Sequence, residues 1–374
     1  MSQELFCPGL RGVIAGETEI CNLDHGIQYR GYALQDLTDG STFIEVAHLL
    51  LFDELPSEEQ FADFLSVIQE EQQLPFVLQE LYEQFPVHNL PLEVLRTGIS
   101  LLNLFDHEPQ EDLLQSYHSQ TINLLAKLPL MVAAWHRLRN GLPQLAPRPE
   151  LSHVGNIYYL LTGDSPCALF EEALDVALIC AMEHELTPSS FVARVVGSVR
   201  SNQYSPVLAA LDAFIGMIHG GGDDRPLDVL NAVGSPDRAE EWIAKLDSET
   251  SIPGFGHPVY RECDPRAAIL DAQCEKLAMA CGRTDLEKLA EAIETTVWKH
   301  RKLPANIDWP LARLFAYLGF DRDLFRPVFV MSRMVGWSAH AYEQCECNEP
   351  IRPRARYRGA VDCPFESIRD RDNR

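Results

Sequence analysis

GFGHPVYRECDPR, residues 254–266, is the stretch of this sequence that says most about its fold and function. Two glycines flank Phe255 just before His257, and Arg266 follows a second proline. The pattern predicts a rigid loop that presents an imidazole and a guanidinium together. Such a pair suits an oxoacid, because the imidazole can donate to a keto oxygen while the arginine binds a carboxylate through two hydrogen bonds. Taken alone, the same pattern also describes a surface loop without a function.

A second candidate is His219, which three glycines follow. Ser205 and Pro206 predict the start of a helix that ends at this histidine. One glycine suffices to end a helix, so three in a row suggest a hinge or a backbone that something approaches closely. The alternative is a helix stop with an incidental histidine.

Asp308 and Arg333 are charged residues in apolar surroundings. Ile307 and Trp309 flank Asp308, which predicts partial desolvation and a carboxylate basic enough to act as a general base. The alternative is a helix N-cap. Arg333 lies in an apolar helix predicted from about 324 to 344, where it needs an anionic partner or a route to water. The alternative there is a structural ion pair.

The overall composition limits the possible partners. The 374 residues carry a formal net charge of -24, which repels polyanions, so no nucleic-acid partner is expected. No apolar run is long enough to span a bilayer and no secretory signal is visible, so we expect a cytoplasmic protein without a membrane partner. The 10 cysteines show no disulfide framework. Cys345 and Cys347 lie near His340 but lack a fourth zinc ligand, so no metal is expected.

The apolar spacing predicts a mainly α-helical fold. Thr42 with Glu45, and Ser57 with Gln60, have the spacing of capping boxes before helical apolar runs. Strand signals are sparse, and the best of them predicts a small N-terminal hairpin within residues 12–23. A proline-rich stretch, residues 141–149, is typical of a surface connection.

These segments occur in an order that resembles the citrate synthase family over nearly the whole chain. The loop at 254–266 fits the family signature G-F-G-H-x-V-Y-x-x-x-D-P-R. The other similar elements are Tyr29-Arg30-Gly31-Tyr32, His184-Glu185-Leu186, His219-Gly220-Gly221, Asn306-Ile307-Asp308, the segment from Arg333 to Gln344, and Ile351-Arg352-Pro353-Arg354. The length and the short N-terminus are similar to the compact bacterial and archaeal type.

The resemblance implies a two-domain helical homodimer. Residues 1–219 and 323–374 would form a large domain and residues 220–322 a smaller one, with the active site in the cleft between them. The implied enzyme is an acyltransferase that condenses oxaloacetate with acetyl-CoA and water to give citrate and CoA. It would need no cofactor besides the CoA thioester, which is a co-substrate.

The resemblance also implies a role for each matching residue. Asp308 would remove a methyl proton from the acyl thioester, His219 would stabilise the enol, and His257 would polarise the keto group of oxaloacetate. The implied oxaloacetate-binding residues are His184, Arg266, Arg333 and, from the partner subunit of the dimer, Arg352.

Four departures from the family pattern fall where acyl-CoA should bind. Gly222-Asp223-Asp224 stands where A-N-E is usual, and Pro258 where a basic residue is usual. Residues 247–251 are acidic and polar where lysines are common. Trp309-Pro310-Leu311-Ala312 follows the expected catalytic aspartate, where the family often has F-Y-S-G. We therefore expect weaker acetyl-CoA binding or a shifted acyl preference.

Two alternative functions stay open. One is 2-methylcitrate synthase, which uses propionyl-CoA, and the residues near Trp309 and Pro310 would decide between the two acyl groups. The other is a non-catalytic, dicarboxylate-binding paralogue. The retained Asp308 argues against this second alternative, because binding alone needs no base.

Overall fold

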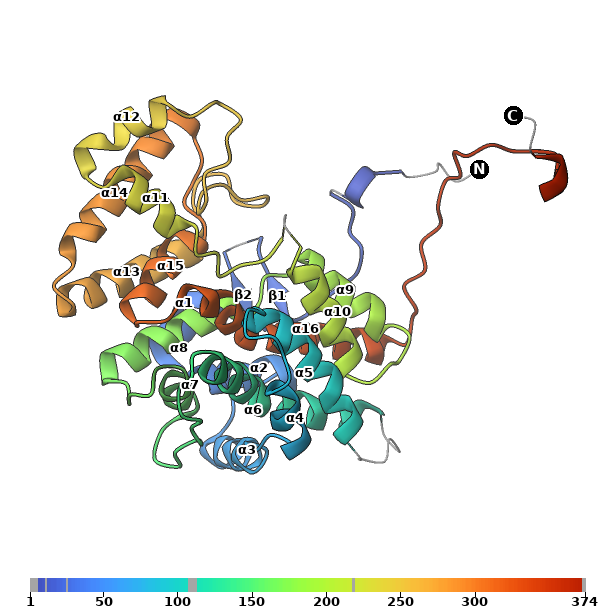
Figure 1. Cartoon of the computed structure of the whole chain (residues 1–374), viewed down its shortest axis with the longest axis horizontal. Helices are drawn as coiled ribbons and strands as arrows, with labels where there is room; N and C mark the ends of the chain where they lie inside the picture. The colour runs from blue at the N-terminus through green and yellow to red at the C-terminus, as the bar shows by residue number, and fades with distance from the viewer. Residues whose placement is uncertain (1–5, 11, 25, 107–112, 217–218, 372–374) are drawn as a thin grey trace.

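The computed structural model of the chain describes residues 6–10, 12–24, 26–106, 113–216 and 219–371. In these ranges the chain forms sixteen α-helices and one small antiparallel sheet, which confirms the mainly α-helical prediction (Figure 1). The α-helices are α1 (Leu34–Gly40), α2 (Phe43–Phe52), α3 (Glu58–Glu70), α4 (Phe76–Tyr82), α5 (Pro91–Phe105), α6 (Leu113–Arg139), α7 (His153–Thr162), α8 (Ala168–Met182), α9 (Pro188–Gly197), α10 (Tyr204–Phe214), α11 (Pro226–Val233), α12 (Ala239–Ala244), α13 (Pro265–Ala280), α14 (Thr284–Arg301), α15 (Asp308–Tyr317) and α16 (Phe325–Cys347). The strands are β1 (Cys21–Asn22), β2 (Gln28–Tyr29) and β3 (Tyr32–Ala33), and short 3-10 helices are η1 (Pro8–Leu10), η2 (Pro236–Arg238), η3 (Arg322–Leu324) and η4 (Ile368–Asp370).

Both predicted capping boxes are present. At the start of α2 the Glu45 carboxylate accepts from the Thr42 backbone N–H at 2.7 Å, and the Glu45 N–H donates back to the Thr42 hydroxyl. Ser57 and Gln60 form the same pair at the start of α3. These bonds satisfy backbone donors that the first helical turn leaves without partners, which fixes where each helix begins.

The predicted hairpin at residues 12–23 is wrong in its position. Residues 12–20 form no strand, and the sheet runs in the order β1-β2-β3. Its tight turn is Arg30-Gly31, between β2 and β3, where both residues have positive φ (47° and 86°). A two-residue turn of this kind matches the twist of paired strands. The apolar pattern of residues 12–23 lacks such a turn.

Helix α10 differs in its bounds from the prediction. It begins at Tyr204, one residue before the expected cap, and ends at Phe214 rather than at His219. The Gly216 N–H bonds to the Ala213 carbonyl oxygen, which tightens the chain as the helix ends. Residues 217 and 218 lie outside the described part of the chain. His219 therefore lies in a turn and not at a helix end.

Buried apolar side chains form two main clusters. The larger surrounds α16, which packs against α2, α6, α8, α9 and α10 near the centre of Figure 1. The second joins α11, α12 and α14 with Phe255 and Trp309, and the three helices lie together at one end of the molecule in Figure 1. The domain boundaries at 219/220 and 322/323 stay a prediction. None of the helices in the described residues is long and apolar enough to cross a membrane.

Candidate active site

The three glycines after His219 are explained by close packing against α16. A Cβ atom on Gly221 would lie 2.4 Å from the Phe329 ring, and one on Gly222 would lie 2.6 Å from the Phe325 carbonyl oxygen. Gly222 also has φ = 68°, which an L side chain adopts only with strain. The turn therefore needs glycine so that α16 can approach it, as the sequence suggested.

Asp308 begins α15, and its carboxylate faces this same turn. Its Oδ1 accepts from the backbone N–H groups of Gly222 at 2.8 Å and Asp223 at 3.3 Å. The residue before the helix is Ile307, so the N-cap interpretation of Asp308 is wrong. Burial, with the Asp223 carboxylate as a second cause, raises the pKa of Asp308 to about 6. A carboxylate of this kind is ionised at neutral pH and more basic than a surface aspartate.

His219 is held in one tautomer by Ser189. The Ser189 backbone N–H donates to His219 Nε2 at 3.2 Å, and the Ser189 Oγ lies 2.8 Å from the same nitrogen. Burial and the neighbouring Arg333 lower the pKa of His219 to about 4, so the ring is neutral at pH 7. A neutral ring whose Nε2 accepts carries its proton on Nδ1. His219 therefore offers one N–H donor.

His257 is fixed in the opposite tautomer by its own loop. The backbone N–H groups of Val259 and Tyr260 donate to His257 Nδ1 at 3.1 and 3.3 Å. Burial, with Arg266 as a second cause, lowers the pKa of His257 to about 4. The proton of the neutral ring is then on Nε2, and Nη2 of Arg266 lies 3.4 Å from that nitrogen. Two donors therefore stand side by side, where one oxygen could accept from both.

Asp264 connects this loop to the segment that carries Asp308. Its carboxylate accepts from Arg266 at 2.8 and 3.0 Å, and also from the backbone N–H of Ile307 at 3.2 Å. The arginine is thereby fixed, and the loop is joined to the residue directly before Asp308.

His184 and Arg333 complete the group. His184 Nε2 lies 2.8 Å from the Tyr260 hydroxyl, and its ring is 5.1 Å from that of His257. Arg333 is 3% exposed and donates from Nε to the Ala181 carbonyl oxygen at 2.5 Å. Among the described residues it forms no ion pair, so the structural ion-pair interpretation receives no support. Burial lowers the pKa of Arg333 to about 10 and the negative charge of Glu183 opposes that shift, but no ion pair joins the two residues, so the guanidinium remains a ready partner for an anionic ligand.

Arg352 does not join these residues within one chain. It is exposed and follows Ile351, whose N–H donates to Ser198 at 3.0 Å. From there the chain is mostly extended and runs away from the body, as Figure 1 shows. Its expected role in the site of a partner subunit stays a prediction.

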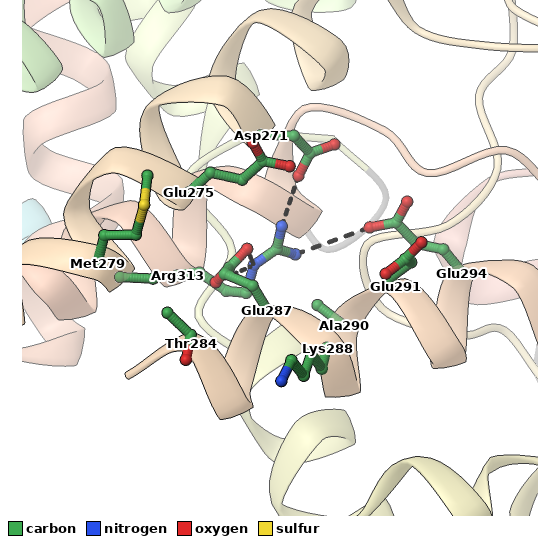
Figure 2. Close-up of a pocket in the computed structure, with 11 residues that line it drawn as sticks. Asp271, Glu275, Met279, Thr284, Glu287, Lys288, Ala290, Glu291, Glu294 and Arg313 are labelled. Atoms are coloured by element: carbon green, nitrogen blue, oxygen red, sulfur yellow. Dashed lines mark hydrogen bonds and ion pairs between the residues drawn. The ribbon is translucent and has the colours of Figure 1, made fainter. Parts of the chain in front are cut away.

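Helix α15 is anchored on its other side by a buried ionic cluster, shown in Figure 2. Arg313 pairs with Asp271 of α13 at 2.5 Å and with Glu287 of α14 at 3.2 Å. Glu294 accepts from the Trp309 indole N–H at 2.5 Å. These contacts border a cavity of about 410 Å³ between the three helices. They hold the first turn of α15, and so the Asp308 backbone, against α13 and α14.

Trp309 also fixes the signature loop. Its side chain is 0% exposed, lies 4.7 Å from the Phe255 ring, and would be 2.9 Å from a Cβ atom on Gly254. Gly254 therefore has to be glycine because an indole packs on it. The Trp309 ring itself is fully buried, and the expectation that the residues near Trp309 and Pro310 decide between the two acyl groups stays a prediction.

The unusual acidic residues at the turn have arginine partners. Arg225 Nε donates to Asp223 at 2.8 Å, and Arg322 binds Asp224 and Asp228 at 2.5 and 2.8 Å. The cation Arg326 lies nearby and donates to the Phe214 carbonyl oxygen at 2.7 Å. The acidic segment 247–251 is likewise bordered by Arg301, which donates to backbone carbonyl oxygens of residues 246–248. The ion pairs of Asp223 and Asp224 partly offset the negative charge of that turn.

Ser189, Asp264 and Tyr260 are site residues that sequence reasoning missed. Ser189 lies in a Thr-Pro-Ser-Ser segment that reads as an ordinary helix start, and nothing in its spacing indicates a partner thirty residues away. Asp264 and Tyr260 both lie inside the signature loop at 254–266. Their polar side chains within that motif were the signal that could have identified them.

Comparison with known proteins agrees with this geometry. The family model described as citrate synthase, C-terminal domain, matches residues 9–354. Citrate synthase 2 of Bacillus subtilis is 37% identical over 97% of this chain and 98% of its own length. The 2-methylcitrate synthase of Shewanella oneidensis is 35% identical over 96% of both chains. The crystal structure of citrate synthase from Pyrobaculum aerophilum matches with a TM-score of 0.89 at 31% identity, covering 97% of this chain and 95% of that one.

The fold and the matches define an acyl-transferring enzyme. The chain belongs to the citrate synthase family, which confirms the resemblance drawn from its sequence.

Proposed function

We propose that this chain condenses oxaloacetate with acetyl-CoA and water to give citrate and CoA. One observation carries the proposal: Asp308, a carboxylate of raised pKa, accepts from the turn that follows His219 and adjoins Ile307, which bonds to Asp264 of the His257 loop. Both histidines are neutral, and each has its donor nitrogen fixed. Base and donors are the parts that a carbon–carbon condensation needs, because an unassisted thioester is a weak carbon acid.

The first step forms the nucleophile. Asp308 would take a proton from the acyl methyl group, while His219 would donate from Nδ1 to the thioester oxygen, which gains negative charge. Ser189 would act through His219 by keeping Nε2 an acceptor. The product of this step is an enol or enolate of the thioester.

The second step forms the carbon–carbon bond. His257 Nε2 and Arg266 Nη2 would both donate to the keto oxygen of oxaloacetate, which becomes the hydroxyl oxygen of the product. Arg333 and His184 would hold its carboxylates, since Arg333 is a buried cation that forms no ion pair within the part of the chain that the structure describes. Hydrolysis of the resulting citryl thioester then releases CoA and makes turnover essentially irreversible.

Assembly and surroundings follow as further parts of the proposal. The enzyme would be a homodimer in which Arg352 of each chain reaches the oxaloacetate of the other. Closure of the two domains would exclude water until condensation is complete. All ten cysteines are free thiols and five are exposed, which supports a reducing, cytoplasmic location.

Thiol release tests the function and its acyl preference together. The wild-type enzyme is mixed with oxaloacetate and either acetyl-CoA or propionyl-CoA, and free CoA is followed with a thiol reagent. We expect a higher kcat/KM for acetyl-CoA, by about 10-fold or more, since one methylene is worth about 10–200-fold in a fitted pocket. A preference for propionyl-CoA would favour 2-methylcitrate synthase, the name of the Shewanella oneidensis relative.

Release with neither thioester would overturn both enzyme functions and favour a dicarboxylate-binding protein. The altered residues on the CoA side predict a KM for acetyl-CoA that is raised by their weaker phosphate contacts. A low KM for acetyl-CoA in the same kinetic measurements would contradict that expectation.

A further inference from the structure

Glu183 is a fully buried carboxylate beside His184 that takes no part in the proposed reaction. Its side chain is 0% exposed and lies where α8 has ended, on the connection that leads to α9. Its Oε1 accepts from the His184 backbone N–H at 2.7 Å. Its Oε2 lies against α16, where a Cβ atom on Gly336 would be 2.1 Å away. The carboxylate therefore joins the backbone of His184 to α16.

His340, on α16, fixes this carboxylate. Both side chains are completely buried, and His340 Nε2 lies 3.1 Å from Glu183 Oε1. Arg194 Nη1 lies 3.1 Å from His340 Nδ1, and Nδ1 must be the acceptor because a guanidinium can only donate. Nδ1 therefore carries no proton. The ring N–H is on Nε2, where it donates to Glu183.

Arg194, on α9, is itself held by several partners. It is 1% exposed and pairs with the Glu343 carboxylate. Its Nε donates to Gln344 at 3.0 Å, and its Nη2 donates to the carbonyl oxygen of Glu17 in the N-terminal segment at 2.9 Å. One continuous chain of hydrogen bonds thus joins four residues, in the order Arg194, His340, Glu183 and His184.

His184 depends on such bonds because it lies outside any helix, on the connection between α8 and α9. The residue after it, Glu185, has φ = 55°, a conformation that residues other than glycine rarely adopt. The Tyr29 hydroxyl accepts from the Glu183 backbone N–H at 3.2 Å, which holds the start of the connection. The His184 ring contacts the Tyr260 hydroxyl, and its backbone N–H is held by the Glu183 carboxylate. The placement of the ring therefore follows the placement of that carboxylate.

The same bonds keep Glu183 apart from Arg333. The charge of Glu183 opposes the lowering of the Arg333 pKa, so the two side chains attract each other. No ion pair joins them among the residues that the structure describes. An ion pair would occupy the guanidinium that the oxaloacetate carboxylate needs, and the bond from His340 holds Glu183 elsewhere.

We propose that His340 is a positioning residue for oxaloacetate binding. Its Nε2–H holds the Glu183 carboxylate, which in turn places His184 and leaves Arg333 free for the substrate. Because His340 is 0% exposed, it acts through Glu183 and does not contact the substrate itself. The inference rests on the proposed function, since it takes oxaloacetate as the ligand of His184 and Arg333.

Three replacements of His340 in the full-length protein test the proposal. Calorimetry gives the Kd of oxaloacetate, and thiol release gives kcat and both KM values. His340→Leu removes both ring bonds, so the Kd and KM of oxaloacetate should rise by about 10-fold, the value of one hydrogen bond to a charged group. The kcat and the KM of acetyl-CoA should change by less than about 2-fold.

Two amide variants separate the bond to Glu183 from the bond to Arg194. The amide of His340→Gln reaches the position of Nε2, so it can donate to Glu183 and should restore the oxaloacetate Kd to within about 3-fold of the wild type. The shorter amide of His340→Asn can accept from Arg194 but does not reach Glu183. This variant should therefore bind oxaloacetate as weakly as His340→Leu.

His153→Leu is the matched control. His153 is another buried histidine, on α7, and neither of its ring nitrogens has a hydrogen-bond partner among the described residues. Its replacement should leave the oxaloacetate Kd unchanged. If His340→Leu does not fold, which circular dichroism would show, the comparison of His340→Asn with His340→Gln decides the matter.

The possible outcomes separate this inference from the proposed function. Unchanged oxaloacetate binding in His340→Leu or His340→Asn, equal losses in the Asn and Gln variants, or the same loss in His153→Leu would each overturn the inference. A wild type that binds oxaloacetate without releasing CoA would overturn the proposed function alone, because the Kd values still test His340. A wild type that binds no oxaloacetate would overturn both.

Discussion

Replacing Asp308 by Asn should make the protein more stable while removing its activity. The amide oxygen of Asn can still accept from the Gly222 N–H, so the turn keeps its shape. The negative charge is lost, and with it both the base and the cost of burying a carboxylate. General-base catalysis is worth about 10²–10⁴-fold, so kcat should fall by that factor.

The gain in stability follows from the pKa of Asp308, which burial raises from 3.8 to about 6. Between these two pH values the unfolded chain gives up this proton while the folded chain keeps it, so stability falls as the pH rises. Above pH 6 the loss is complete and amounts to at most about 3 kcal/mol, at about 1.4 kcal/mol per pH unit. The side chain is only partly buried, so this figure is an upper bound.

Thermal unfolding at pH 7.5 measures the effect. For 374 residues, an unfolding entropy of about 2 cal/mol/K per residue converts 3 kcal/mol into a Tm increase of about 4 °C at most. Asp237→Asn, which changes an exposed carboxylate, is the matched control and should shift Tm by less than about 1 °C. An Asp308→Asn protein that melts below the wild type, or that keeps its kcat, would refute the reasoning.

Three further predictions concern the same site. Ser189→Ala removes a bond that keeps His219 Nε2 an acceptor, so kcat should fall by about 3–10-fold with little change in the oxaloacetate KM, and rescue by Ser189→Thr would support a positioning role. Arg333→Gln should weaken oxaloacetate binding by about 10–100-fold, measured by calorimetry, and an unchanged Kd would contradict the assignment. In the wild type, kcat should fall as the pH drops below about 6, because protonated Asp308 cannot accept the methyl proton; a kcat that is constant down to pH 5 would contradict the assignment of the base.

Much of the site could be predicted from local sequence because its parts are rigid loops. In residues 254–266 the order of glycine, histidine and arginine specifies the loop, and the structure gives Gly254 a packing reason in Trp309. The three glycines after His219 likewise predicted a close approach, and α16 is the element that makes it. Such glycine positions can be recognised in a sequence because no other residue type fits the backbone there.

What sequence reasoning missed depends on contacts between distant segments. Ser189 orients His219 across thirty residues, and Glu294 binds Trp309 from another helix. Neither serine nor glutamate on a helix is unusual, so their types give no signal. The hairpin was misplaced for a different, local reason: the turn that pairs its strands is Arg30-Gly31, where an arginine adopts positive φ.

Product analysis under turnover tests the central claim most directly. The enzyme is incubated with oxaloacetate and acetyl-CoA, and citrate and free CoA are both quantified by mass spectrometry. We predict that the two products accumulate in equal amounts, because hydrolysis follows formation of the carbon–carbon bond. Release of CoA without citrate would identify a thioesterase, and absence of both products would contradict a condensing role for Asp308, His219 and His257.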